Sequence, residues 1–236
     1  MAAAITVKDV HVKYHSVKSM SIRRAVSGKR DSQYVHALKG VSFEVEKGEI
    51  VGVLGSNGGG KSTLLRTIAG VFVPDSGCVD LHGNSCSLLA IGVGFVQNLS
   101  GRENIMLSGM LLGFTKKQIQ DKMDDIIEYS ELGNFIDLPV RTYSSGMYSK
   151  LAFSITATLK TDVLLIDEVL SVGDEQFKKK SFETMKALIR DEDRTVVIVS
   201  HSLEQLRELC SRVIWLEHGE IIEIGTPDEI IKKYRG

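Results

Sequence analysis

The chain has 236 residues, of which 43% are hydrophobic and 25% charged, and its formal net charge is −1 at pH 7. This composition is typical of a globular protein with a sizeable core, and the near-neutral charge excludes the basic footprint that nucleic-acid binding needs. The three cysteines match no zinc or disulfide framework, and no apolar run reaches the ~18 residues of a membrane span, so we expect a reduced, cytoplasmic chain.

Two kinds of apolar run predict the strands of the first third. Val41, Phe43 and Val45 alternate with polar residues, which is typical of a half-buried strand. The run EIVGVLG, residues 49–55, is continuously apolar and ends at a glycine cluster, as a buried strand does. Helical spacing follows over residues 61–71.

A mostly helical block is predicted from about residue 99 to 160. Thr115 and Gln118 form a capping box before a segment whose apolar residues fall on one helical face. Those apolar residues are Ile119, Met123, Ile126 and Ile127.

The last third alternates strands with helices again. Residues 161–168 and 194–201 are buried-strand candidates that end in polar residues. A hairpin with His218 and Gly219 at its turn follows, and helices are predicted to begin near Ser202 and Thr226. We therefore predict an α/β fold, one domain over residues 1–236, with an inserted helical subdomain.

A nucleotide-binding motif lies between the second strand and its helix. The stretch GSNGGGKS matches G-x-x-x-x-G-K-[ST], in which backbone N–H groups surround phosphate oxygens. Lys61 would place its charge on the β- and γ-phosphates, and Ser62 would offer a hydroxyl to Mg²⁺. The predicted nucleotide-binding residues are Gly55, Ser56, Asn57, Gly58, Gly59, Gly60, Lys61, Ser62 and Thr63.

Two later strands end in groups suited to phosphate hydrolysis. Asp167 would hold Mg²⁺, and Glu168 beside it would polarise the attacking water. His201, after the next strand, would contact the γ-phosphate and hold the geometry of the water and the carboxylate. The alternatives are a solvated acidic turn and a merely structural histidine.

The order of these motifs resembles that of ATP-binding cassette (ABC) ATPases over nearly the whole chain. The turn Ser144-Ser145-Gly146 before a helix resembles the signature motif of the family, although Tyr143 and Met147 depart from it. The resemblance implies a P-loop core with a mostly parallel sheet and an N-terminal antiparallel β subdomain. It also implies that two copies enclose ATP, so that this turn covers the γ-phosphate held by the other copy.

Three further residues are assigned by the same resemblance. Asp174, which the resemblance makes a nucleotide-binding residue, ends SVGD, which is similar to the D-loop that crosses to the opposite subunit. Tyr14 resembles the aromatic residue that stacks on adenine, with Tyr34 as the alternative. Gln97 resembles the Q-loop glutamine, a magnesium ligand, with Asn98 as the alternative.

Within the family, the stretches YSSGM, DEVLSVGD and NLSGREN resemble the ATPase subunits that power export of bacterial cell-envelope polysaccharides, including O-antigens and teichoic acids. This implies a polytopic permease as partner, a lipid-linked glycan as cargo, and a place at the cytoplasmic face of the membrane. Because the chain ends at KKYRG, we expect no C-terminal carbohydrate-binding domain.

Other interpretations of the sequence stay open. The basic insertion at about 15–33 is either a solvated surface segment or one that faces anionic lipid headgroups or the diphosphate of the glycan. The rivals to a transporter subunit are a soluble ABC ATPase acting on DNA or ribosomes, a P-loop kinase, and a regulatory subunit that binds nucleotide without hydrolysis.

Overall fold

The computed structural model describes residues 2–15, 34–89, 94–167 and 173–235. Two sequence predictions lie outside this range. They are the catalytic role of Glu168 and the basic insertion, of which only residue 15 is described.

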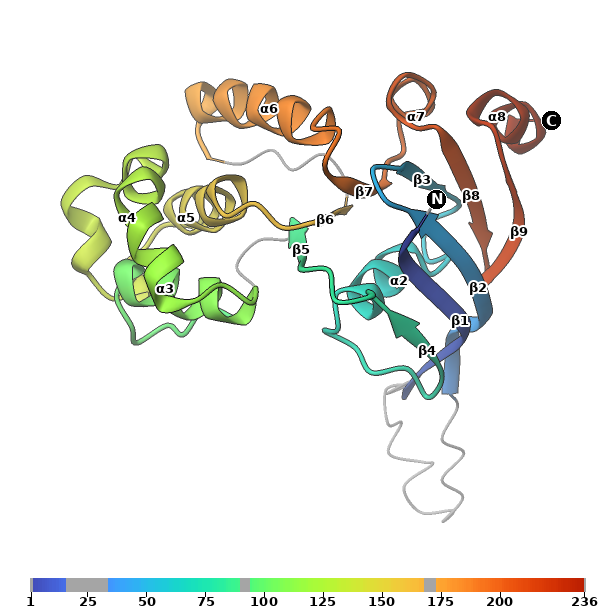
Figure 1. Ribbon diagram of the computed structural model, residues 1–236, viewed down its shortest axis with the longest axis horizontal. Coiled ribbons are helices and arrows are strands. Elements are labelled where there is room, and N and C mark those ends of the chain that lie inside the picture. Colours follow the sequence, from blue (N-terminus) through green and yellow to red (C-terminus); the bar gives the residue numbers. More distant parts are fainter. Residues whose placement is uncertain (1, 16–33, 90–93, 168–172, 236) are drawn as a thin grey trace, which may run out of the picture.

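A three-stranded antiparallel sheet forms the N-terminal part (Figure 1). In its long second strand, Val41, Phe43 and Val45 are buried, whereas Ser42 and Glu44 between them are exposed. The predicted alternation is therefore confirmed. The strands, in sheet order, are β2 (Tyr34–Glu46), β1 (Ala3–His15) and β4 (Ser76–Asp80).

A six-stranded sheet forms the centre of the molecule, and all its strands except the last are parallel. Apolar residues fill the inner strands, because helices cover both faces of a parallel sheet. In sheet order the strands are β5 (Cys86–Leu89), β6 (Val163–Asp167), β7 (Thr195–Val199), β3 (Ile50–Leu54), β8 (Arg212–Glu217) and β9 (Glu220–Gly225).

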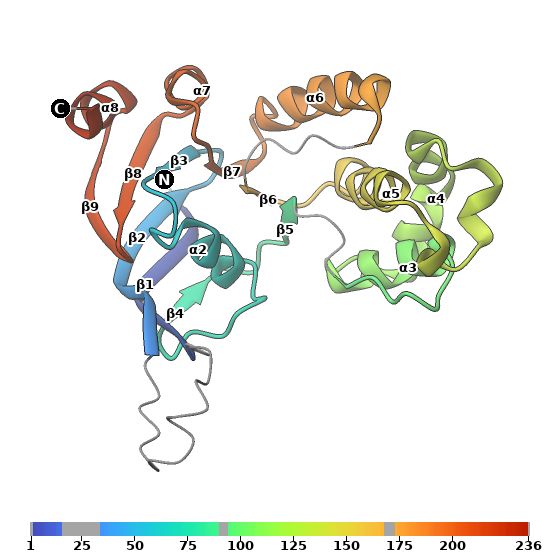
Figure 2. The ribbon, with the colours of Figure 1, turned by 180° about the vertical axis from the view of Figure 1, so that it is seen from behind.

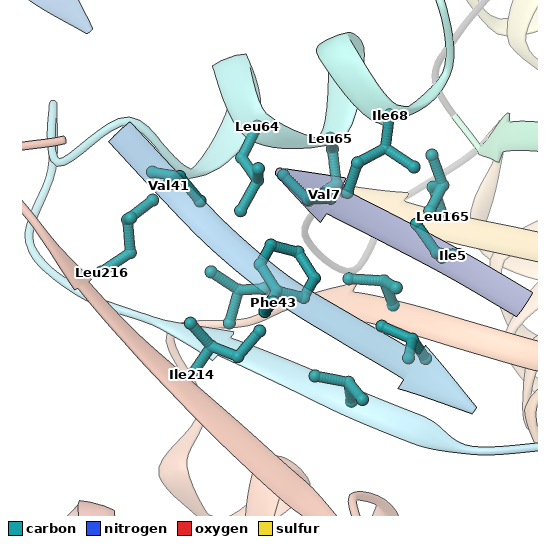
Figure 3. Close-up of a cluster of buried hydrophobic side chains, with 14 of the residues drawn as sticks. Ile5, Val7, Val41, Phe43, Leu64, Leu65, Ile68, Leu165, Ile214 and Leu216 are labelled. Carbon is teal, nitrogen blue, oxygen red and sulfur yellow. The ribbon is translucent and has the colours of Figure 1, made fainter. Parts of the chain in front are cut away.

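One helix lies between the two sheets. Figure 3 shows Leu64, Leu65 and Ile68 of α2 (Lys61–Ile68) directed at the cluster around Phe43. The opposite face of the six-stranded sheet has a second apolar cluster, which includes Phe177, Leu206 and Ile230. These come from α6 (Glu175–Ile189), α7 (Leu203–Leu209) and α8 (Pro227–Arg235).

The inserted helices gather at one end of the molecule, away from the antiparallel sheet, as both views show (Figures 1 and 2). They have a core of their own, which includes the predicted face of Ile119, Met123 and Ile126. The Thr115–Gln118 capping box is present as predicted. The elements are α3 (Gly101–Leu111), α4 (Lys116–Ser130), the 3₁₀ turns η1 (Gly133–Asp137) and η2 (Val140–Thr142), and α5 (Ser145–Thr158).

Among the residues that the structure describes, no helix combines the length and the apolar character that a membrane crossing requires.

Candidate nucleotide site

Several strands of the parallel sheet end at one edge, and their following residues meet there. The backbone register aligns Asp167 of β6 with Val199 of β7, and Val199 with Val53 of β3. The residues after β3 and β7 therefore lie beside Asp167, which is where open α/β sheets hold their ligands. A cavity of about 460 Å³, within the usual range for small-molecule sites, opens at this edge. Its lining includes Tyr14, Asn57, Gly58, Gly60, Lys61, Ser62, Thr63, Asp167 and His201.

The P-loop is held in a phosphate-binding shape by its own backbone. Gly59 N donates to the carbonyl of Ser56 at 3.1 Å, and Leu64 N donates to the carbonyl of Gly60 at 2.8 Å. Gly60 has a φ of 105°, and a Cβ there would lie 2.5 Å from the carbonyl oxygen of Ala37. Glycine is therefore required at residue 60 by both backbone conformation and space.

Lys61 lies over this loop. Its side chain is buried, and Nζ donates to the carbonyl oxygens of Gly55 at 2.8 Å and Ser56 at 2.7 Å. The ammonium group is thus already placed at the cavity wall. A phosphate entering the loop would meet this charge at close range.

Ser62 and Asp167 form the oxygen pair that a magnesium ion needs. Ser62 Oγ donates to Asp167 Oδ1 at 3.0 Å, although the two residues are 105 positions apart in the chain. Hydroxyl and carboxylate oxygens suit Mg²⁺, which takes few protein ligands and keeps waters and phosphate oxygens for the rest. The residues present therefore fit this ion.

His201 lines the cavity on the side of β7. Its predicted carboxylate partner, Glu168, follows Asp167 directly and is outside the described residues.

Tyr14 is one of the cavity residues, whereas Tyr34 is not. The Tyr14 hydroxyl lies 3.1 Å from Thr63 Oγ1, and its ring meets the edge of Phe72 with centroids 5.8 Å apart. The geometry favours Tyr14 of the two sequence alternatives for the adenine contact.

The Ser144-Ser145-Gly146 turn begins α5 and does not line the cavity. Ser144 is the N-cap, and its Oγ accepts from Met147 N at 3.2 Å. A Cβ added to Gly146 would meet only Ser144 Oγ, at 3.8 Å, which is ordinary contact. Nothing within the described chain thus requires glycine at residue 146.

A family model described as "ABC transporter" matches residues 38–171, more than half of the chain. This chain belongs to the ABC transporter family. It is 46% identical to "O-antigen export system ATP-binding protein RfbB" of Klebsiella pneumoniae over 84% of the chain and 80% of that protein.

Two longer ABC relatives are also similar. The chain is 42% identical over 97% of its length to the RfbB protein of Myxococcus xanthus, and 49% identical over 88% to "Teichoic acids export ATP-binding protein TagH" of Lactococcus lactis. It covers 52% and 44% of these two proteins, so it spans about half their length.

Solved ABC structures share the fold at low identity. The dimeric ATP-binding cassette MJ0796, in a post-hydrolysis state bound to ADP and phosphate, matches with a TM-score of 0.69 and 20% identity. The match covers 94% of this chain and 98% of that one. The predicted α/β architecture is thereby confirmed.

Asp174, assigned to the ABC D-loop, is engaged within the chain. It is the N-cap of α6, accepting from Phe177 N at 3.0 Å, and it pairs with Lys150 Nζ at 2.6 Å. The hydrogen bond from Lys150, followed by that from Phe177 N, lowers the pKa of Asp174 to about 2. Lys150, in α5, also pairs with Glu131 at 3.4 Å. It therefore joins α5 to the end of α4 and to the start of α6.

Gln97, assigned to the ABC Q-loop, is exposed and does not line the cavity, and neither does Asn98. The Gln97 carbonyl accepts from Arg141 N at 2.9 Å, which joins this loop to the turn before Ser144.

A side-chain contact with the P-loop was not indicated by the sequence. Glu217, the last residue of β8, accepts a hydrogen bond from Ser56 Oγ. Since β8 is the parallel neighbour of β3, a polar residue at its carboxyl end was the available signal.

Proposed function

We propose that this chain is the ATP-hydrolysing subunit of a transporter that exports a lipid-linked cell-envelope polysaccharide or teichoic acid. The observation that carries the proposal is one cavity that brings P-loop residues, Lys61 and Ser62 among them, together with Asp167 and His201. Similarity to ATP-binding proteins of O-antigen and teichoic acid export supports the cargo class.

The predicted site residues would divide the tasks of ATP hydrolysis among them. Lys61 would place its ammonium charge on the phosphate oxygens, and Tyr14 would stack on adenine. Ser62 and Asp167 would hold Mg²⁺, with Gln97 as a further ligand if its loop moves towards the cavity. When bound, Mg²⁺ neutralises charge that develops on the phosphates. Glu168 would orient the attacking water, and His201 would contact the γ-phosphate.

A second copy of the chain would complete each site. The open side of the cavity needs hydrogen-bond donors for the γ-phosphate, and the start of α5 offers a hydroxyl and free N–H groups. Ser144, Ser145 and Gly146 are exposed or half-buried and leave room for a ligand. The solved ABC neighbour MJ0796 is a dimer bound to ADP and phosphate, which supports this arrangement.

The permease would dock where the inserted helices meet the core. An apolar groove of about 320 Å³ lies there, lined among others by Val71, Phe95 and Leu111. Val71 is 45% exposed and Leu111 66% exposed, and both line the same groove; adjoining exposed apolar residues of this kind are typical of an interaction site. We propose that a permease segment fills this groove and holds the chain at the cytoplasmic face of the membrane.

The decisive experiment is depletion of the chain in its host. Lipid-linked glycan should accumulate inside the cells, and wild-type protein should restore export while Lys61→Ala does not. If Lys61→Ala restored export, ATP hydrolysis by this chain would not be needed for transport. If depletion caused no accumulation of lipid-linked glycan, the proposed cargo class would be wrong.

Dimer dependence is tested in vitro. The rate of phosphate release per chain should fall as the protein is diluted into a monomeric regime. Ser144→Arg should retain ATP binding and lose hydrolysis, whereas the control Asp121→Arg, on the exposed side of α4, should retain both. A rate per chain that stays constant on dilution contradicts the shared site.

A further inference from the structure

The P-loop has a cavity side and a rear side. Of its first six residues, three line the cavity, namely Asn57, Gly58 and Gly60. The other three do not, namely Gly55, Ser56 and Gly59.

The end of β8 and the turn that follows it, residues 216–219, lie directly behind the rear side. A Cβ on Gly55 would lie 1.9 Å from the carbonyl oxygen of Leu216, and one on Gly59 would lie 3.2 Å from the same oxygen. Gly219 N donates to the Gly59 carbonyl at 2.9 Å. Two of the three rear residues, Gly55 and Gly59, therefore lie against the backbone of residues 216–219.

The third rear residue, Ser56, is held by a side chain. Glu217 Oε1 accepts from Ser56 Oγ, and Glu217 Oε2 accepts from Ser56 N at 3.3 Å. Trp215 Nε1 donates to the same Oε2 at 3.3 Å. These donors, Ser56 Oγ above all, lower the pKa of Glu217, so the carboxylate is ionised at neutral pH.

Ser56 connects Glu217 to Lys61, the phosphate-binding lysine, because it contacts both residues. The N–H and hydroxyl of Ser56 are both used by Glu217, which leaves its carbonyl as the group facing the loop. That carbonyl accepts from Gly59 N at 3.1 Å and from Lys61 Nζ at 2.7 Å. If the backbone of Ser56 were free to change its dihedral angles, its carbonyl would lose the contacts with both Gly59 N and Lys61 Nζ.

We propose that Glu217 is a positioning residue for the nucleotide site: it fixes Ser56 with its donors turned away from the cavity, so that Lys61 and the cavity-side residues keep the shape that binds phosphate. Trp215, whose ring meets the edge of Tyr234 of α8 with centroids 5.6 Å apart, supports the carboxylate in turn. The inference rests on the proposed ATP binding at the P-loop.

The test measures the Kd for Mg·ATP of the full chain by calorimetry, together with kcat and KM for phosphate release. Charge-assisted hydrogen bonds contribute strongly to local geometry, so Glu217→Ala should raise Kd and KM about tenfold, ~1.4 kcal/mol, and change kcat by less than about threefold. Glu217→Gln, which keeps an acceptor oxygen, should stay within about threefold of wild type in Kd.

A second carboxylate of the same hairpin supplies the matched control. Glu220 pairs with Lys39 at 3.7 Å and, within the part of the chain that the structure describes, makes no hydrogen bond or ion pair with the P-loop, so Glu220→Ala should leave Kd unchanged. Ser56→Ala should weaken binding as much as Glu217→Ala, and the double variant should be no weaker than either alone, because one interaction is removed only once.

Three outcomes overturn the inference. They are a Kd for Glu217→Ala within twofold of the Glu220→Ala value, additive effects of Ser56→Ala and Glu217→Ala, and a fall in Tm with no change in Kd. Wild-type chain that binds no Mg·ATP would instead overturn the proposed function together with this inference.

Discussion

Replacing Gly146 by alanine should make the isolated chain more stable and the enzyme less active. Gly146 lies in the first turn of α5, and the added methyl group would meet only Ser144 Oγ, at 3.8 Å. Alanine in a helix at an unstrained position loses less conformational entropy on folding, which is worth about 0.5–1 kcal/mol. For a chain of this size, that raises the Tm by about 2 °C.

The activity should move in the opposite direction. If the start of α5 closes on the γ-phosphate of a second copy, the methyl group occupies the space through which its N–H groups approach. A misplacement of about 1 Å at a reacting group can cost on the order of a hundredfold in rate, so we expect phosphate release to fall at least about tenfold. ATP binding by the isolated chain should not change.

Calorimetric unfolding measures the change in stability, and a phosphate-release assay measures the change in activity. Gly109→Ala is the control, because a Cβ there would lie 2.6 Å from Cγ1 of Ile119 and should cost about 1–3 kcal/mol of stability through overpacking. A lower Tm for Gly146→Ala would refute the open-space argument. A wild-type rate of phosphate release would show that the Ser144-Ser145-Gly146 turn is only a helix cap.

Three other outcomes are expected. Glu168→Gln should bind ATP, fail to hydrolyse it and accumulate as an ATP-bound dimer in size-exclusion chromatography; normal turnover would exclude Glu168 as the residue that activates water. Lys150→Met should lower the urea midpoint at pH 6, and the gap to wild type should narrow as pH falls from 4 towards 2. The sign follows from the pKa of Asp174, which is about 2 in the folded chain and 3.8 in its ordinary state. A carboxyl group whose pKa is lowered by folding stabilises the fold at pH values above its ordinary pKa. This stabilisation is lost as the pH falls and the group is protonated. A thiol reagent at pH 8 should label exposed Cys78 rapidly, and half-buried Cys86 and buried Cys210 much more slowly, since burial raises the pKa of both to about 12; equally rapid labelling of all three would contradict this.

The strands, caps and cavity residues were predictable because their signals are local. Apolar runs in the sequence predict β3, β6 and β7. Because the carboxyl ends of parallel strands meet at one edge of the sheet, Asp167 and His201 are then expected beside the P-loop. Even the Ser62–Asp167 contact follows from two short motifs.

What sequence reasoning missed depends on contacts between distant segments. Glu217 reaches Ser56 only because β8 pairs with β3, and the hairpin signal gave no reason to choose that neighbour. Asp174 stays a predicted nucleotide-binding residue, and its contacts with Lys150 and Phe177 N form a pairing that no spacing in the chain indicates. Gln97 remains a predicted magnesium ligand, with its side chain exposed beside the helical end of the molecule.

The internal bonds of the P-loop have a thermodynamic consequence. Its Gly59–Ser56 and Leu64–Gly60 hydrogen bonds and the Lys61 contacts all join residues of the loop and of the helix that follows it, so we expect nucleotide binding to order little additional backbone. Segments that fold on binding show a large negative heat-capacity change. A loop already in shape should show a small one, together with an association rate limited by diffusion and orientation rather than by a slow rearrangement of the loop.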